Sequence, residues 1–443
     1  LVLVLLPVLA VAAAPQTLTG KTVWREQVQL TASVIVPVDA ELLVAPGTTV
    51  VVTDPNVKIT VQGLLRIDGR STRPVVFQTP PGWLGIDFYG RGKVPHVVTY
   101  AEFSSAKVAL STIETELLIR NCRFHDCETA VKLLRETKTL IEDCTFTDNN
   151  IGVDVEMKSR PTIRHNRFSG HRKAAIIASH GSFGPISGNT FEKNEQAIGL
   201  MQKYTDELSD NRFIDNKVGI YCNQTQSTPL ITRNYFSGNE NALVNFSFSY
   251  PQVEDSTFIA NQTAVRNDQF GSPAITNSLF RDNRLAVYNY RKANPTLKQN
   301  LFEKNEVVLF CDYSSYPQVK DNHFIRNRQV VELGIFQSAD WEKRSGSKGI
   351  VMEQAQARRT QNPLLAKAPT EFNDYVDVSG NWWGDDTVQL AAVGDGNSAL
   401  FFDRHDKPTV TYEGFGQESY VLDIVRFRPW LKKPLAEIGP RGK

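Results

Sequence analysis

The chain has 443 residues, of which 41% are hydrophobic and 22% are charged, and its 49 Lys and Arg residues almost balance 48 Asp and Glu residues. Because these charges are spread evenly, no basic stripe of the kind that binds nucleic acid is expected. Residues 1–14 are an apolar run that is too short to span a membrane and predicts the partial signal peptide of an exported protein. We therefore expect a periplasmic, cell-surface or extracellular protein with no membrane span after signal removal.

Residues 15–118 contain short segments in which apolar and polar residues alternate. Residues 42–52 and 59–69 are examples, and turn residues such as Pro and Gly separate the segments. A period of two residues is typical of strands with one buried face. This region is expected to form irregular β-helix coils together with an N-terminal cap, because an open solenoid end exposes unpaired backbone groups.

Residues 119–335 carry a regular repeat whose most visible element is a phenylalanine every 22 or 23 residues. An aliphatic residue stands five positions before each of these phenylalanines, and Asn, Gly, Ser and Pro separate three short apolar segments per unit. The sequence predicts an all-β right-handed parallel β-helix with about 22 residues and three strands per coil, capped at both ends. The ten phenylalanines are Phe124, Phe146, Phe168, Phe191, Phe213, Phe236, Phe258, Phe280, Phe302 and Phe324.

Asparagine recurs two residues before and three residues after these phenylalanines. We interpret these columns as structural ladders at the corners of the coils, because Asn tolerates the left-handed backbone of tight turns. Asn245, Asn267 and Asn289 form a third column, which we expect to point inward as a buried amide ladder; a role facing a substrate is the alternative.

The 22-residue repeat is interrupted after Phe324, and the next equivalent aromatic residue is Trp383 in the segment Gly380-Asn381-Trp382-Trp383-Gly384. The gap of 59 residues corresponds to one coil and an insertion, which we place at residues 336–375. Within it, residues 350–367 are expected to be a short helix or a flap. Residues 376–443 are expected to form the final coil and C-terminal cap, with a closing strand at residues 427–431.

Five cysteines in an exported chain raise the possibility of disulfides. Cys122 and Cys144 share one column, one coil apart, and so would stack at about 4.8 Å. Buried free thiols are the interpretation we favour, and a Cys122–Cys144 bridge is the alternative. The seven histidines share no column. We therefore predict no metal site and no other cofactor.

The N-x-F-x-x-N repeat, the opening PGT and VQGLLRIDG segments, the GNWWG element and the FRPWL ending resemble those of bacterial right-handed parallel β-helix proteins. This group includes pectin lyase-like proteins and the periplasmic NosD-like family, and the resemblance covers residues 30–431. It implies the fold but no particular activity. The Asn-Thr-Asp, Asp-Asp and Gly-His elements of polygalacturonases do not occur as a set on successive coils, and the Asp-Pro-His element of alginate epimerases is absent. NosD-like proteins are associated with copper delivery, which the three Met and the scattered His residues do not support.

Aromatic residues gather where the coils should face outward on one sheet, at eight, ten and twelve positions after the repeat phenylalanine. Contiguous exposed aromatic surface marks interaction sites, and an elongated solenoid face matches a polymer. The alternative is that the insertion packs over these residues. We call this set the aromatic face: Tyr221, Phe246, Phe248, Phe270, Tyr288, Tyr290 and Phe310, with Tyr250, Tyr313 and Tyr316 near the following corner.

The candidate ligand-binding residues are therefore part of this face together with Arg266. They are Tyr221, Phe246, Phe248, Arg266, Phe270, Tyr288, Tyr290 and Tyr313. Asp268 and Asp312 are the candidate catalytic residues, because they share one column two coils apart, a separation of about 9.6 Å that is near the upper end for inverting glycosidases. Arg266 and Arg291 are expected to be close enough to bind an acidic sugar.

Three functions remain open at this point. The first is binding of a polysaccharide or of an envelope or extracellular partner protein, the second is cleavage of a polysaccharide, and the third is a structural role in a larger envelope or extracellular assembly.

Overall fold

The structure is a computed structural model that describes residues 14–90, 92, 94–225, 228–346, 373–394, 396–412 and 417–441. The signal peptide predicted for residues 1–14 lies almost wholly outside these residues, and the helix or flap predicted at 350–367 lies outside them completely. The chain forms two units, one of residues 1–155 with 159–162 and the other of residues 156–158 with 163–443. No helix among the described residues is long and apolar enough to cross a membrane.

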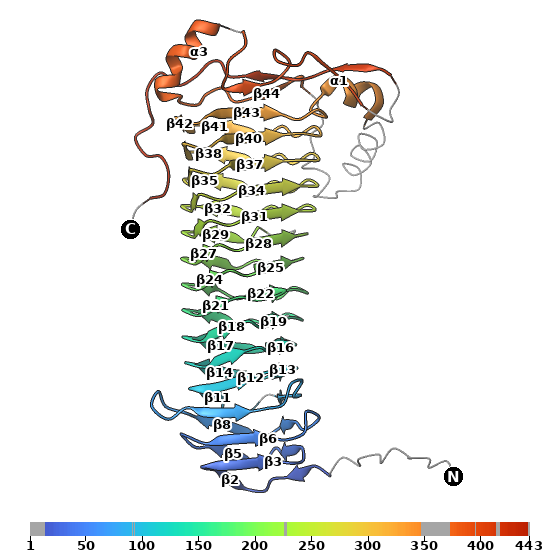
Figure 1. The fold of residues 1–443 in the computed structure, drawn as a ribbon, viewed down its shortest axis with the longest axis vertical. Helices are drawn as coiled ribbons and strands as arrows, with labels where there is room; N and C mark the ends of the chain where they lie inside the picture. Colours follow the sequence, from blue (N-terminus) through green and yellow to red (C-terminus); the bar gives the residue numbers. More distant parts are fainter. Residues whose placement is uncertain are drawn as a thin grey trace, which may run out of the picture. The chain divides into compact units, whose positions relative to one another are not determined.

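The first unit is a parallel β-helix built from three sheets (Figure 1). One sheet contains β1 (Gln16–Thr17), β4 (Val34–Val36), β7 (Ile59–Val61), β10 (Ile86–Tyr89), β13 (Val108–Ile113), β16 (Thr129–Leu134) and β19 (Ile151–Val155). The second contains β2 (Lys21–Trp24), β5 (Glu41–Val44), β8 (Leu64–Asp68), β11 (His96–Thr99), β14 (Glu116–Arg120) and β17 (Lys138–Glu142). The third contains β3 (Gln27–Leu30), β6 (Thr49–Val52), β9 (Val75–Gln78), β12 (Ala101–Ser104), β15 (Arg123–His125) and β18 (Thr145–Thr147).

The second unit repeats this arrangement, also with parallel strands in three sheets. The sheet of the aromatic face contains β22 (Ala174–Ala178), β25 (Gln196–Met201), β28 (Val218–Asn223), β31 (Asn241–Phe246), β34 (Thr263–Asp268), β37 (Leu285–Asn289), β40 (Val307–Cys311), β43 (Gln329–Leu333) and β45 (Phe401–Phe402). Another contains β20 (Thr162–Arg164), β23 (Ile186–Ser187), β26 (Glu207–Ser209), β29 (Leu230–Thr232), β32 (Gln252–Glu254), β35 (Ala274–Thr276), β38 (Thr296–Lys298) and β41 (Gln318–Lys320). The last contains β21 (Arg167–Ser169), β24 (Thr190–Glu192), β27 (Arg212–Ile214), β30 (Tyr235–Ser237), β33 (Thr257–Ile259), β36 (Leu279–Arg281), β39 (Leu301–Glu303) and β42 (His323–Ile325).

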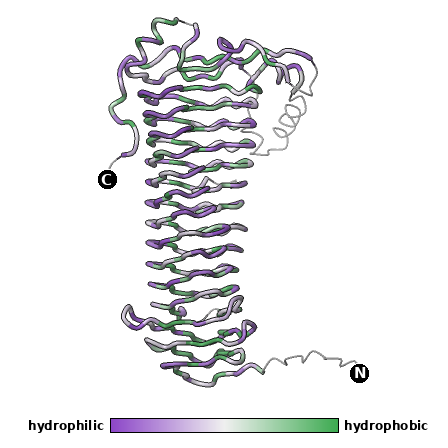
Figure 2. Tube along the Cα trace, viewed as in Figure 1, coloured by the Kyte–Doolittle hydropathy of each residue, from purple (hydrophilic) through white to green (hydrophobic). Residues whose placement is uncertain are grey.

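The phenylalanine repeat forms the interior of the coils, which confirms the predicted fold. All ten repeat phenylalanines are fully buried. The ring of Phe258 lies between those of Phe236 and Phe280, with centroid distances of 4.6 and 4.7 Å and ring planes that differ by 2° and 4°. Apolar residues thus alternate with polar ones along each coil (Figure 2), because successive strand residues point to opposite faces.

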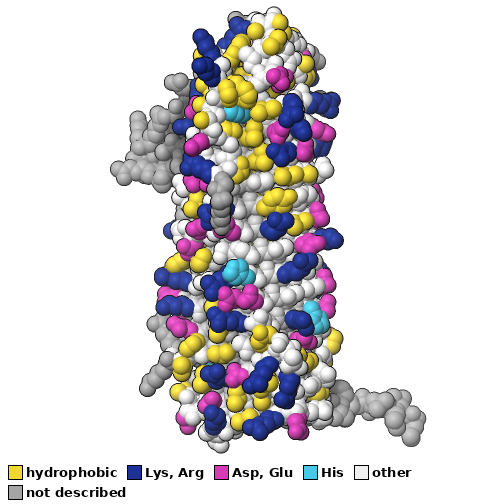
Figure 3. Space-filling view, turned by 90° about the vertical axis from the view of Figure 1, so that its left-hand side faces the viewer, with side chains coloured by type: hydrophobic (Ala, Val, Ile, Leu, Met, Phe, Trp, Pro, Cys, Tyr) yellow, Lys and Arg dark blue, Asp and Glu magenta, His cyan; other side chains and the backbone are white. Residues whose placement is uncertain are grey.

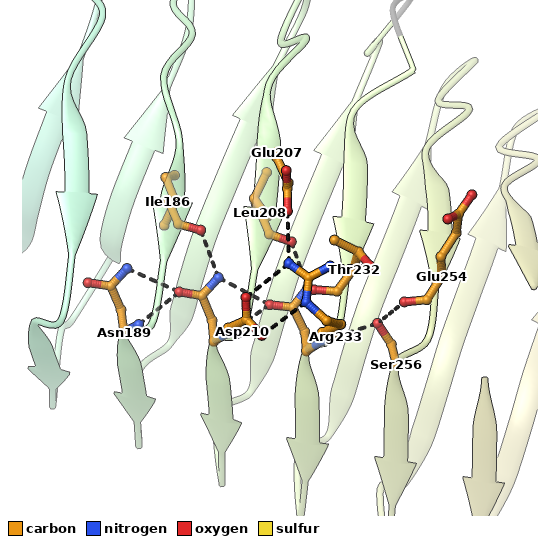
Figure 4. A network of polar contacts seen from close by, with 11 residues as sticks. Ile186, Asn189, Glu207, Leu208, Asp210, Thr232, Arg233, Glu254 and Ser256 are labelled. Carbon is orange, nitrogen blue, oxygen red and sulfur yellow. Dashed lines mark hydrogen bonds and ion pairs between the residues drawn. The ribbon is translucent and has the colours of Figure 1, made fainter. Parts of the chain in front are cut away.

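The asparagine columns are buried hydrogen-bonded ladders (Figure 4). Asn189 donates its side-chain amide to Asn211 Oδ1 at 3.0 Å, and Asn211 donates to Asn234 Oδ1 at 3.1 Å. The inward ladder is also confirmed, because Asn245 donates to Asn267 and Asn267 to Asn289, each at 2.9 Å.

One part of our explanation for these ladders was wrong. The left-handed residue at each corner is the one that precedes the ladder position, such as Asp210 before Asn211 (φ 58°) and Asp215 before Asn216 (φ 53°). The asparagines are therefore selected for hydrogen bonding rather than for their backbone conformation.

The coil after the insertion continues both ladders, as predicted. Trp383 lies 4.8 Å from Phe324 between ring centroids, and Asn381 Oδ1 accepts from Asn322 Nδ2 at 3.0 Å. The C-terminal cap contains α1 (Ala339–Trp341), a π-helical turn (Glu342–Gly346), β44 (Tyr375–Asp377), a 3₁₀ turn (Gly384–Asp386), α3 (Thr387–Val393), β46 (Thr409–Thr411), β47 (Ser419–Val421) and β48 (Ile424–Arg426).

The closing strand lies before the FRPWL segment rather than within it. β48 pairs with β44 in parallel and ends at Arg426. Phe427 instead packs against Phe401, with ring centroids 5.1 Å apart, so this residue contributes to the apolar interior of the cap.

Candidate functional site

The aromatic face lies along β28, β31, β34, β37 and β40 and the corners that follow these strands. Strand pairing places Arg266 beside Tyr288 and Tyr288 beside Phe310, so these three residues form one outward column. Phe246 pairs with Asp268, and the backbone N–H of Tyr290 donates to the carbonyl oxygen of Asn267. Tyr290 therefore lies beside Asp268, and Phe246, Asp268 and Tyr290 form a second outward column. The aromatic residues of both columns are half-buried, as expected for side chains that lie on the outside of a sheet.

Phe248 and Phe270 lie at the corner rather than on the sheet, because β31 ends at Phe246 and β34 ends at Asp268. Both have positive φ values, 60° and 67°. Their rings stack with a centroid distance of 4.8 Å and thereby extend the aromatic face around the corner.

Besides the pair of Phe248 and Phe270, the rings of the face form two further groups of contacting rings. Tyr221 and Phe246 stack at 6.4 Å between centroids. Tyr288 lies 5.1 Å from Phe310 and 5.8 Å from Tyr290, and Tyr290 meets the ring of Tyr313 edge-on at 5.0 Å. The structure therefore places the candidate aromatic residues on one sheet and the corners that follow it, in three groups of contacting rings. Tyr250 is instead buried.

The described start of the insertion and the C-terminal cap contact one end of this face. Tyr313 lies 4.4 Å from Phe336 and 6.1 Å from Trp341 between ring centroids. Phe336 in turn stacks on Tyr412 at 4.5 Å. The aromatic surface thus continues into a cap that the 22-residue period could not predict, because these residues lie outside the regular coils.

Two arginines lie over tyrosine rings of the face. The guanidinium carbon of Arg266 is 5.1 Å from the centroid of Tyr288, and that of Arg291 is 5.1 Å from the centroid of Tyr290. Both arginines are exposed, and neither forms a salt bridge with any of the residues that the structure describes. Such stacking holds a guanidinium flat on the ring while its N–H groups stay available at the edge.

Asp268 is 8% exposed and lies near both arginines. Burial raises the pKa of its carboxyl group, and the positive charges of Arg291 and Arg266 partly oppose that rise. Its Oδ1 atom is buried and has no hydrogen-bond partner among the described residues. A buried acceptor of this kind is uncommon, because a carboxylate oxygen normally finds a donor.

Asp312 has a different environment, although it lies in the same column as Asp268 with Tyr290 between them. Its Oδ1 atom accepts the backbone N–H groups of Tyr313 at 2.9 Å and Phe336 at 2.8 Å. Burial raises its pKa to about 6 despite these two bonds. A Cβ atom at Gly334 would lie 2.3 Å from the Asp312 carboxyl carbon, so the chain passes this side chain closely.

A buried polar network, which the sequence analysis did not predict, joins the corners of the coils to the cap. Lys292 and Glu342 form an ion pair at 3.3 Å, with side chains 7% and 1% exposed, and burial lowers the pKa of Lys292. Asp423 accepts from the hydroxyl of Tyr316 at 3.0 Å and from Gln337 Nε2 at 3.1 Å. Burial raises the pKa of Asp423 to about 7.

All five cysteines are free and buried, so Cys122 and Cys144 are not bridged. Burial raises the pKa of Cys222 and of Cys311 to about 12, which keeps these thiols protonated. Among the histidines, His96 accepts the backbone N–H of Leu65, and burial lowers its pKa to about 4.

Comparison with known proteins identifies the family. A sequence model for the family described as "Periplasmic copper-binding protein (NosD)" matches residues 85–247 and 244–386, which together span more than half of the chain. The chain belongs to the NosD family. A NosD-family protein is a periplasmic β-helix scaffold, so the family supports the prediction that the protein is exported.

Solved structures of the periplasmic alginate epimerase AlgG are also similar to this NosD-family chain. A double mutant of that enzyme is 15% identical with a TM-score of 0.32, and the match covers 70% of this chain and 75% of that one. Another AlgG structure is 13% identical with a TM-score of 0.28 and covers 69% and 75%. No curated protein matches the chain.

Proposed function

We propose that this NosD-family protein is a periplasmic scaffold that binds a polysaccharide along its aromatic face. The observation that carries the proposal is the row of half-buried rings on β28, β31, β37 and β40 and at the corners of these coils and of β34, which contact one another in three groups. Flat apolar rings with polar edges suit the alternating apolar and hydroxyl surfaces of sugars. Repetition of the coils at about 4.8 Å presents these rings along a line, as an extended polymer requires.

The distribution of charge supports a localised site. On another sheet and at its corner, Arg167, Arg281 and Arg326 pair with Glu192 or Glu303. Figure 3 shows one face of the molecule, on which positive and negative side chains lie close together. Arg266 and Arg291 lack such partners within the described residues and lie on the aromatic face instead.

Polysaccharide cleavage is the second candidate. It rests on Asp268 and Asp312, whose pKa values are both raised, as a general acid requires. However, Asp312 Oδ1 already accepts hydrogen bonds from two backbone N–H groups, so a structural role is sufficient to explain why an aspartate lies at this position. The geometry therefore favours binding over cleavage.

The family description names copper, but the described residues do not fit a copper site. Among them, no three His, Cys, Asp or Glu side chains come close enough together to hold a metal ion. Burial raises the pKa of Cys222 and of Cys311 to about 12, whereas a cysteine must lose its proton to bind copper. We therefore propose no copper chemistry for this part of the chain.

The test is a panel of neutral and charged polysaccharides, measured by affinity electrophoresis and then by calorimetry. Phe246→Ala and Tyr290→Ala should each weaken binding by about 3–10-fold, because each removes one stacked ring. Tyr235→Ala is the matched control, since Tyr235 is a half-buried tyrosine on β30, on another sheet, and also lies under an arginine, at 4.7 Å from Arg212.

Three outcomes would contradict the proposal. Equal losses in all three variants would show that the aromatic face is not the site. Release of reducing ends or of unsaturated products would establish the enzyme instead. Stoichiometric co-purification with an envelope protein, lost in the same two variants and without binding to any polysaccharide, would establish a protein partner.

A further inference from the structure

We propose that Arg266, Asp268 and Arg291, with Tyr288 and Tyr290, form a subsite that recognises an anionic sugar unit. This inference rests on the proposed function, and it names the class of polysaccharide: one that bears carboxylate or sulfate groups. We call these five residues the anionic subsite.

The fold brings the five residues together from two neighbouring coils. Arg266 on β34 pairs with Tyr288 on β37, and Asn267 pairs with Asn289. The next residues in each coil, Asp268 and Tyr290, therefore lie side by side, and Arg291 follows at the corner. The left-handed backbone of Arg291 (φ 51°) turns the chain immediately after Tyr290.

The two guanidinium groups are the anion-binding element of the subsite. Each is exposed, is held over a tyrosine ring at 5.1 Å and has no salt bridge within the described residues. A guanidinium that is already ordered on a ring loses less freedom when a ligand binds, and its planar N–H groups match a carboxylate or sulfate.

Asp268 supplies the complementary acceptor. Its buried Oδ1 atom lacks a hydrogen-bond partner within the described part of the chain. A sugar hydroxyl can donate to this carboxylate while the acidic group of the same sugar faces the arginines. An acidic sugar carries both a hydroxyl donor and an anionic group on one unit, whereas a neutral sugar carries only the hydroxyl donor.

The nearby rings favour a glycan over an acidic peptide. Tyr288 and Tyr290 belong to a group of rings that continues through Phe310 and Tyr313. A row of rings offers successive sugar units the same stacking contact, whereas a peptide with acidic side chains would need only the arginines.

The decisive probes are polygalacturonate and its fully methyl-esterified form, which differ in charge but keep the same sugar ring. The wild-type protein should bind the unesterified polymer at least 10-fold more tightly in calorimetry at low salt. The double variant Arg266→Gln, Arg291→Gln should reduce this ratio to about one. Dextran sulfate against dextran gives the same comparison for sulfate groups, and the larger of the two ratios identifies the preferred anion.

The matched control is Arg212→Gln, because Arg212 also lies over a tyrosine on the neighbouring strand, Tyr235, but on a different sheet. It should leave the ratio unchanged. For the acceptor, Asp268→Asn should retain binding of the methyl ester, and Asp268→Leu, which has a similar shape but no acceptor, should weaken it about 5-fold. Thermal unfolding should show that each variant is folded.

The possible failures are distinct. Equal binding of charged and neutral polymers, still weakened by Phe246→Ala, would overturn the anionic subsite and keep the proposed function. No binding of any polymer would overturn both. Binding of polyglutamate that depends on the two arginines but not on Phe246 would show that the arginines serve an acidic peptide, and would overturn recognition of an anionic sugar.

Discussion

Phe258 offers a quantitative test of the interior ladder. Its ring is fully buried and stacks between Phe236 at 4.6 Å and Phe280 at 4.7 Å. Phe258→Ala removes the buried ring and leaves a cavity, which typically costs about 3–5 kcal/mol. The two lost aromatic contacts place the expected value in the upper half of that range, because such pairs contribute about 0.5–1.5 kcal/mol beyond their buried area.

Urea denaturation followed by circular dichroism would measure this loss, as a lower midpoint at an unchanged slope. Phe248→Ala is the comparison, because Phe248 stacks on Phe270 at a similar distance, 4.8 Å, but is only half-buried. We expect it to cost less than about 1.5 kcal/mol. A loss below about 1 kcal/mol for Phe258→Ala, or equal losses for both, would refute the placement of the repeat phenylalanines inside the coils.

Four further predictions concern buried polar groups. Asn239→Ala should destabilise the protein by about 1–3 kcal/mol in the same urea assay without changing polysaccharide binding, because Asn216 and Asn261 lose their ladder partner; a loss of binding at unchanged stability would contradict its structural role. Lys292→Met should cost about 3–5 kcal/mol by leaving Glu342 buried without its cation, and adding Glu342→Met should recover most of this loss. Because burial raises the folded pKa of Asp312 to about 6, the contribution of Asp312 to stability is complete below about pH 4 and is lost as the pH rises through 6. Asp312→Asn should remove this part of the pH dependence of stability. An unchanged pH profile in this variant would contradict the prediction. A thiol reagent should modify none of the five buried cysteines before unfolding and all of them afterwards, as read from absorbance.

Periodicity explains why so much of the coil structure could be predicted. In a solenoid, residues 22 apart are in contact, so a repeat in the sequence is directly a list of neighbours in space. The phenylalanine stack, the asparagine ladders and the equivalence of Trp383 with Phe324 all follow from that relation. The outward direction of the aromatic face follows from the alternation of side chains along a strand.

Only the tertiary structure showed the contacts that do not follow the 22-residue repeat. Asp423 bonds to Gln337, 86 residues away, and Lys292 pairs with Glu342, because the cap folds back on the corners of the coils. The same contacts make the hydrogen bonding of Asp268 and Asp312 different. The backbone N–H of Phe336 donates to Asp312, whereas Oδ1 of Asp268 lacks a partner among the described residues. The sequence determined which residues stack, and three-dimensional packing determined which buried polar groups find a partner.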